Sequence, residues 1–435
     1  MRWLSVIAIV ASITVPPAAH AAFSAPEEVA HASGFNTGFV AAADATGRLT
    51  VATRAPRPGF PYRAGPPRLI ERPPDGTWSD LPPVPGIAYG VYSTSIAAAG
   101  EGALGLAWWV RARSSSIHVA LRDPGGTLSD PIEIAGAQAD GVAHPAIAVD
   151  AAGDVLLAYE TGTAASHLHM QGAIAVAYRP AGSSSFIGPT VVDRVLSNPP
   201  VVALAQDGTG IVTWTRQRAL MASTVGSDGA VGAARRIARQ VLGDRPVVAA
   251  GPRSAASLAY RVNETALHGK HASVRYSLRV LARPAGGTFG RAHTVFRGSS
   301  INRGVALAAD EQGRATLAWT GAALASRATG SRIWTAAGRA GRPFGHPRMV
   351  APRDDSFDEA VSIAARNGHV GLAWRELTAG TPTGVQVAAA GWNEALDPEL
   401  ISSAPPAERP AVTVAGDGRT SAFWRTGKLW VSYGS

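Results

Sequence analysis

Residues 145–159, PAIAVDAAGDVLLAY, place two apolar stretches on either side of a short turn. The first stretch ends at Val149, residues 150–153 (DAAG) turn the chain, and residues 155–159 return it. An aspartate at the start of such a turn caps backbone N–H groups, and a glycine at its end accepts a positive φ. The segment therefore predicts a β-hairpin.

The aromatic residue that ends this hairpin recurs along the chain. It occupies seven positions, spaced 46 to 59 residues apart: Trp108, Tyr159, Trp214, Tyr260, Trp319, Trp374 and Trp424. Six of the seven follow a glycine by six residues, as Tyr159 follows Gly153. A fixed phrase that returns at such a period indicates a repeat architecture.

Each hairpin is followed by two further strand-like segments, which in the clearest unit are residues 173–178 and 186–192. Four strands in about 50 residues are typical of a propeller blade. An earlier unit, residues 39–53, keeps the hairpin but has Thr53 in the aromatic position. We therefore expect an all-β fold, a β-propeller of eight four-stranded blades, with seven blades as the alternative.

The two ends of the chain complement each other. Residues 409–435 supply only three strands of a last blade, whereas residues 23–29 (FSAPEEV) match fourth-strand segments such as 128–134. We expect the N-terminal strand to complete the C-terminal blade, because this pairing closes the ring and covers exposed strand edges. Residues 22–435 then form a single propeller domain.

Residues 1–21 have the features of a signal peptide. Arg2 precedes an apolar run, and the small residues Ala19 and Ala21 mark a cleavage site before Ala22. The run is too short for a stable membrane anchor, and the mature chain contains no candidate transmembrane segment. We expect a secreted or periplasmic protein.

Composition limits the classes of function. The chain has no cysteine, which excludes disulfides, a thiol nucleophile and thiolate metal sites. Its formal net charge is +9, but the arginines are scattered rather than clustered. Scattered charge argues against a specific nucleic-acid partner, because such a site needs a basic patch. The partner stays unknown; a glycan, an envelope polymer or a protein ligand fits the sequence.

The turns between third and fourth strands carry a decayed motif. Residues 123–128 (DPGGTL), 283–289 (RPAGGTF) and 75–78 (DGTW) each keep part of the pattern Ser-x-Asp-x-Gly-x-Thr-Trp. This pattern resembles the Asp-box of sialidase-like secreted propellers. The resemblance implies the architecture and no catalytic residue, because the Asp-box lies away from the catalytic centre of that family. The Arg-Ile-Pro segment of sialidases is absent from the sequence.

Two loops between second and third strands contain paired histidines. His167 and His169 lie in one of these loops, and His268 and His271 lie in the other. Histidines two or three positions apart can share a metal ion if further ligands are present. Exposed loop histidines are the simpler interpretation, so we name the four as candidate ligand-binding residues and predict no metal site.

An acidic connection provides the next candidates: Asp354, Asp355, Asp358 and Glu359. Such carboxylates can hold a hard cation or act as paired acids in glycoside cleavage. No calcium-loop spacing is met, and a solvated connector is the ordinary interpretation of such a run.

Two aromatic residues complete the candidate set. Trp109 follows Trp108 and therefore points to the opposite side of its strand, and Tyr89 lies in a connection rich in proline and glycine. Both rings are suited to stacking against a sugar. Packing between blades is the alternative, because aromatic side chains bury large areas there.

No complete catalytic set is present in the sequence, so we predict no catalytic residue and no cofactor. The expected function is that of an exported, non-catalytic propeller that binds a ligand or a protein. The alternative is a glycan-directed hydrolase or lyase of sialidase-like architecture.

Overall fold

The computed structural model describes residues 22–434 except 31–37, 58–59, 83–90, 112–114, 136–140, 164–170, 195–197, 243–244, 269–270, 324–330, 355–360, 379–380 and 407. Within the described ranges every regular element is a β-strand. No described helix is long and apolar enough to cross a bilayer. The predicted signal peptide lies outside the described residues.

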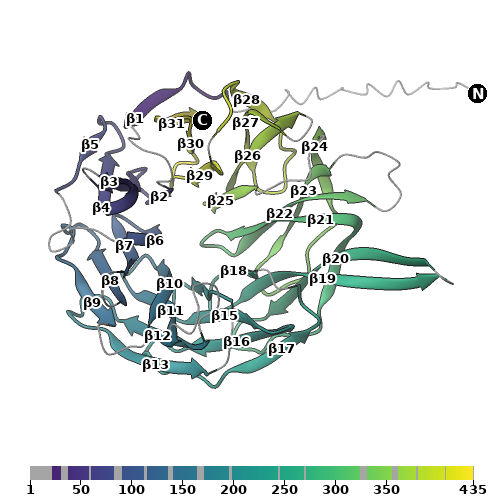
Figure 1. Cartoon of the computed structure of the whole chain (residues 1–435), viewed down its shortest axis with the longest axis horizontal. Coiled ribbons are helices and arrows are strands. Elements are labelled where there is room, and N and C mark those ends of the chain that lie inside the picture. Colours follow the sequence, from purple (N-terminus) through teal and green to yellow (C-terminus); the bar gives the residue numbers. More distant parts are fainter. Residues whose placement is uncertain are drawn as a thin grey trace, which may run out of the picture.

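The chain folds as a β-propeller, in which antiparallel sheets surround a central axis (Figure 1). The first blade contains β2 (Phe39–Ala43), β3 (Leu49–Arg57), β4 (Phe60–Arg72) and β5 (Ser79–Asp80). The second contains β6 (Val91–Ala99), β7 (Ala103–Arg111), β8 (Ser115–Arg122) and β9 (Ile132–Ala135). The third contains β10 (Val142–Val149), β11 (Val155–Thr163), β12 (Gln171–Arg179) and β13 (Ile187–Asp193). The fourth contains β14 (Val201–Leu204), β15 (Gly210–Arg216), β16 (Ala219–Val225) and β17 (Arg235–Arg239).

The next sheet has seven strands: β18 (Val247–Ala250), β19 (Ala256–His268), β20 (His271–Arg283), β21 (His293–Ala309), β22 (Arg314–Ala323), β23 (Ser331–Arg339) and β24 (Arg348–Asp354). Another four-stranded sheet contains β25 (Ser362–Arg366), β26 (His369–Thr378), β27 (Thr381–Gly391) and β28 (Glu399–Ser402). The last contains β29 (Ala411–Val414), β30 (Thr420–Arg425), β31 (Leu429–Gly434) and β1 (Glu27–Ala30).

The seven-stranded sheet divides into two blade-like units that share β21. The first residues of β21, as far as Gly298, pair with β20, and the remainder pair with β22. Each unit then has four strands, so the described strands are consistent with the predicted eight blades. β19 and β20 continue past their neighbours as a two-stranded arm that projects from the ring (Figure 1).

Strands from both ends of the chain close the ring, as predicted. β1 pairs with β31, with Glu27 opposite Val431, and the N–H of Ser24 donates to the carbonyl of Tyr433 at 2.8 Å. An ion pair of 2.6 Å between Glu28 and Lys428 adds to this contact. The resulting sheet has the order β1, β31, β30, β29.

The repeated aromatic residues form the core between blades. Each lies on the second strand of its unit, and none is more than 4% exposed. Trp108, Trp214 and Trp319 are completely buried, each in a different hydrophobic cluster. Their regular spacing therefore reflects packing between blades.

The turns between first and second strands interlock around the axis. The N–H of Ala45 donates to the carbonyl of Gly100 at 2.7 Å, and the N–H of Gly416 donates to the carbonyl of Ala45 at 3.0 Å. Asn367 donates its side-chain amide to the carbonyl of Gly416 at 2.9 Å and its backbone N–H to Glu311 at 3.2 Å. Five blades are joined in this way at the narrow end of the ring.

We expect Gly416→Ala to destabilise the propeller, because a Cβ at this position would lie 2.1 Å from the carbonyl oxygen of Ala45. The turns would have to separate, at a cost of about 1–3 kcal/mol of unfolding free energy. Thermal denaturation measures the effect. Gly290→Ala is the matched control, since its Cβ would meet only the carbonyl of Ala282 at 3.7 Å. Equal melting temperatures for the two variants would show that the interlocked turns contribute little.

Candidate functional site

The antiparallel strands divide the loops between two faces of the propeller. We call the end that carries the turns between first and second and between third and fourth strands the turn face. The opposite end, with the loops between second and third strands and the connections between blades, is the loop face. Each described candidate residue lies near the loop-face end of its strand: Trp109 on β7, His268 on β19, His271 on β20 and Asp354 on β24.

Most of the predicted site residues lie outside the described residues: His167, His169, Tyr89, Asp355, Asp358 and Glu359. His268 and His271 face each other as the last pair of the arm formed by β19 and β20, and their side chains are not described. Asp354 ends β24, where it pairs with Ser331, and its side chain is likewise not described. Their roles stay predictions.

Among the candidate ligand-binding residues named from sequence, Trp109 is the one whose described side chain lies in a polar cluster. It lies near the end of β7, half-buried, with its ring centroid 5.7 Å from that of His144 on β10. His144 Nδ1 lies 2.8 Å from a carboxylate oxygen of Glu160 on β11. The three side chains come from neighbouring blades and lie toward the loop face.

An axial cavity of about 350 Å³ lies where the inner strands of four consecutive blades begin at the loop face. Its wall is formed by Val247, Val305, Ala306, Leu307, Val361, Ser362, Ile363, Arg409 and Pro410. All these residues are apolar except Ser362 and Arg409. Arg409 is exposed and makes no ion pair with a carboxylate in the described ranges.

Arg366 connects two blades that are not neighbours in the ring. Its Nη2 donates to the carbonyl of Ala98 at 3.2 Å, which lies on a blade three positions away around the ring. Its Nε lies 3.2 Å from the carboxylate of Glu311. Burial lowers the pKa of Arg366, and the charges of Glu311 and Asp44 oppose this shift.

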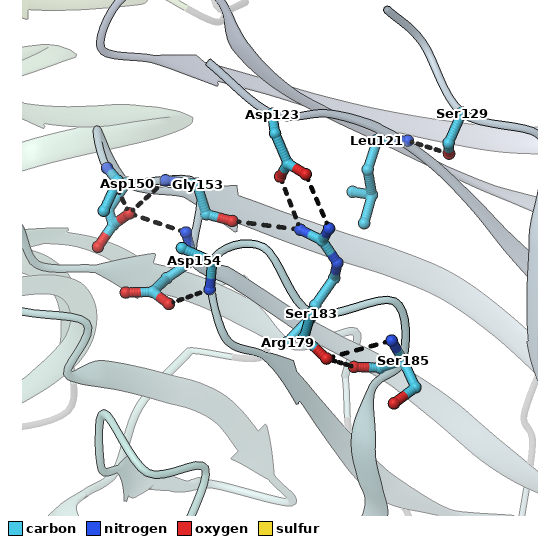
Figure 2. A network of polar contacts seen from close by, with 11 residues as sticks. Leu121, Asp123, Ser129, Asp150, Gly153, Asp154, Arg179, Ser183 and Ser185 are labelled. Carbon is cyan, nitrogen blue, oxygen red and sulfur yellow. Dashed lines mark hydrogen bonds and ion pairs between the residues drawn. The ribbon is translucent and has the colours of Figure 1, made fainter. Parts of the chain in front are cut away.

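Carboxylates at the turn face are engaged in ion pairs and in turns. Figure 2 shows one such network, in which Asp123 forms a bidentate ion pair with Arg179 of the next blade, at 2.9 and 3.0 Å. One carboxylate oxygen of Asp150 accepts the backbone N–H groups of residues 152, 153 and 154 at 2.9 to 3.0 Å. Burial, and then the neighbouring charge of Asp154, raise the pKa of Asp150 to about 6.

Arg179 is one of several arginines that end the third strand of a blade, a regularity that we did not predict. An arginine ends the third strand in five units: Arg72, Arg122, Arg179, Arg283 and Arg339. Arg122 likewise reaches the preceding blade, where it binds Glu71 at 2.5 Å. Alignment of the repeats would have revealed the series. No comparable signal marks His144, Glu160 or Arg409.

The structure offers no metal site within its described part, where no three histidine or carboxylate side chains are grouped to hold an ion. The histidine and acidic segments named from sequence fall largely outside that part.

Comparisons with known proteins agree with the fold. No protein-family model and no curated protein matches the chain. Among solved structures, the Dos1 propeller aligns with a TM-score of 0.52 and 8% identity over 95% of each chain. The propeller domain of the trilobed protease from Pyrococcus furiosus gives 0.45 and 10% identity over 79% of this chain and 94% of its own. The polysaccharide lyase Uly1 gives 0.43 and 10% identity over 82% and 91%. Such low identities show the β-propeller fold alone.

We expect the charge of Asp150 to reduce stability above its ordinary pKa of 3.8, because the folded state binds its proton more tightly than the unfolded state does. The free energy of unfolding then falls between about pH 4 and pH 6, and the penalty is fully present above pH 6. Asp150→Asn should remove about 1–3 kcal/mol of this penalty at pH 7, since its amide oxygen still accepts the turn N–H groups.

Urea denaturation of the wild type and Asp150→Asn from pH 4 to 8 checks this prediction. Their difference isolates the carboxyl group of Asp150 from all other titrating groups. Asp207→Asn, in the corresponding turn of the next blade, is the control. A variant that is less stable than the wild type at pH 7 would contradict the assignment.

Proposed function

We propose that the chain is an exported, non-catalytic β-propeller that binds a ligand or a protein at its loop face. The observation that carries the proposal is the axial cavity, whose described wall is apolar except for Ser362 and Arg409. An apolar wall binds by excluding water, and a single guanidinium at its rim selects an anionic group. The formal net charge of +9 favours the same class of ligand.

The absence of a carboxylate from the described cavity wall supports a binding role over a catalytic one. Hydrolysis or elimination needs a group that transfers protons within reach of the bound substrate. The described carboxylates at the turn face are engaged in turns and ion pairs, as Asp123 and Asp150 illustrate. The glycan-directed alternative depends on Asp354, Asp355 and Asp358, and the resemblance to sialidase-like propellers belongs with that alternative.

Binding of anilinonaphthalene sulfonate, an anionic aromatic probe, tests the cavity. We expect one site, about tenfold weaker in Arg409→Gln, because the guanidinium contact is lost. Ile363→Trp should abolish binding, because the larger side chain fills the cavity. Ile187→Trp is the control, since Ile187 is 45% exposed on the outer strand β13. Fluorescence titration of folded proteins gives the affinities.

Equal binding by all four proteins would contradict the cavity as the binding site.

A second experiment tests for catalysis. The same proteins are incubated with a mixture of oligosaccharides, and new reducing ends are measured. We expect none. Release of reducing ends that disappears in Asp354→Asn or Asp355→Asn would overturn the non-catalytic proposal in favour of the hydrolase.

Export has its own prediction. When residues 1–435 are produced in a bacterium with a signal peptidase, the extracytoplasmic fraction should contain a chain that begins at Ala22. Intact-mass measurement identifies the cleavage site. Residues 22–435, produced without the leader, should stay in the cytoplasm. An uncleaved chain in the cytoplasm would contradict residues 1–21 as a signal peptide.

A further inference from the structure

His144 has an unusual backbone conformation for its position in the fold. Its φ is 50°, in the left-handed region, although it lies inside strand β10. The other described non-glycine residues with positive φ lie outside strands: Gln217, Gln240, Arg253, Ser254, Asn367 and Asn393. A non-glycine residue in this region costs free energy and often occurs at functional sites.

The cause is a β-bulge. Pairing between β10 and β11 places Ala143 opposite Glu160 and Ala146 opposite Ala158, so two residues of β10 face one residue of β11. A bulge re-aims side chains, and bulges are common beside active sites. Here it turns the imidazole of His144 toward Glu160.

The contact between His144 and Glu160 determines which nitrogen of a neutral imidazole carries the proton. An ionised carboxylate only accepts hydrogen bonds, so in the neutral imidazole the contact of 2.8 Å with Glu160 places the ring proton of His144 on Nδ1. The Glu160 side chain is 8% exposed, whereas the His144 side chain is 41% exposed. Nε2 of His144 has no partner among the described residues and is then an acceptor available to solvent or a ligand.

Trp109 and Arg245 complete the surroundings. The Trp109 ring lies 5.7 Å from the imidazole at an angle of 46°, which places an apolar ring beside a polar nitrogen. Arg245, just before β18, lies near enough for its charge to act on Glu160. These side chains place an apolar ring beside polar and charged groups on the loop face. The site shares no residue with the axial cavity.

We propose that Trp109, His144 and Glu160 form a binding site for a sugar unit. A pyranose ring presents an apolar C–H face and adjacent hydroxyl groups. The indole of Trp109 covers the apolar C–H face of the sugar, and Nε2 of His144 accepts a hydrogen bond from one of its hydroxyl groups. Glu160 is a positioning residue, because it fixes the tautomer that makes Nε2 an acceptor. The bulge and the contact with Glu160 orient the imidazole before the sugar binds.

An array of neutral and acidic oligosaccharides, followed by titration of the sugars that bind, tests the site. His144→Asn removes Nε2 and keeps a residue that tolerates positive φ, so we expect at least about tenfold weaker binding. Trp109→Phe should weaken binding about threefold, because the smaller ring covers less of the sugar. His118→Asn is the matched control. His118 stacks on Trp108 at 5.8 Å, just as His144 lies beside Trp109, but its backbone is that of an ordinary strand.

The wild-type protein supplies an independent measurement. Diethyl pyrocarbonate modifies accessible imidazoles, and mass spectrometry locates the modified residues. A bound sugar should protect His144 at least about threefold and leave His118 unchanged. Failure of every sugar to bind, binding unaffected by His144→Asn and Trp109→Phe, or unprotected His144 would each overturn the proposal. Arg409→Gln and Ile363→Trp should not affect sugar binding, which separates this site from the axial cavity.

Discussion

The pairing of β1 with β31 is the contact on which the ring depends. A blade buries its apolar faces only if it has a neighbour on each side, so a propeller must close on itself. Here the first and last segments of the chain share one sheet, and the ion pair of Glu28 with Lys428 lies at that junction. The buried aromatic residues between blades and the interlocked turns at the axis lie within the ring that this closure completes.

The two faces use polar residues differently. At the turn face, carboxylates and arginines satisfy one another and cap backbone N–H groups, as in the contact of Asp123 with Arg179. Such groups are unavailable to a ligand unless the fold opens. At the loop face, Nε2 of His144 and the guanidinium of Arg409 have no described protein partner. The two proposed binding sites are therefore separated in space from the contacts that stabilise the propeller.

The sequence predicted most of the architecture, because each blade needs the same kinds of residue at the same positions in its turns and its core. Glycine in the turns, aromatic residues on second strands and the match of residues 23–29 to fourth strands all follow from that repetition. The site does not repeat. Trp109 was identifiable from strand alternation. Pro145 is compatible with a bulge but also with an edge strand, so it did not identify His144, and Glu160 comes close to His144 only because it pairs with Ala143. Arg409 meets Val247 and Leu307 only because the ring brings distant segments together.

Strand β21 joins two blades within one continuous sheet. Its first residues hydrogen-bond to β20, and its later residues hydrogen-bond to β22. The pairing is irregular between Ile301 and Val305, where the strand passes from one blade to the next. Val305 and Leu307 of the same strand line the axial cavity. The outer edge of one blade is therefore covalently continuous, along a single strand, with the cavity wall in the next.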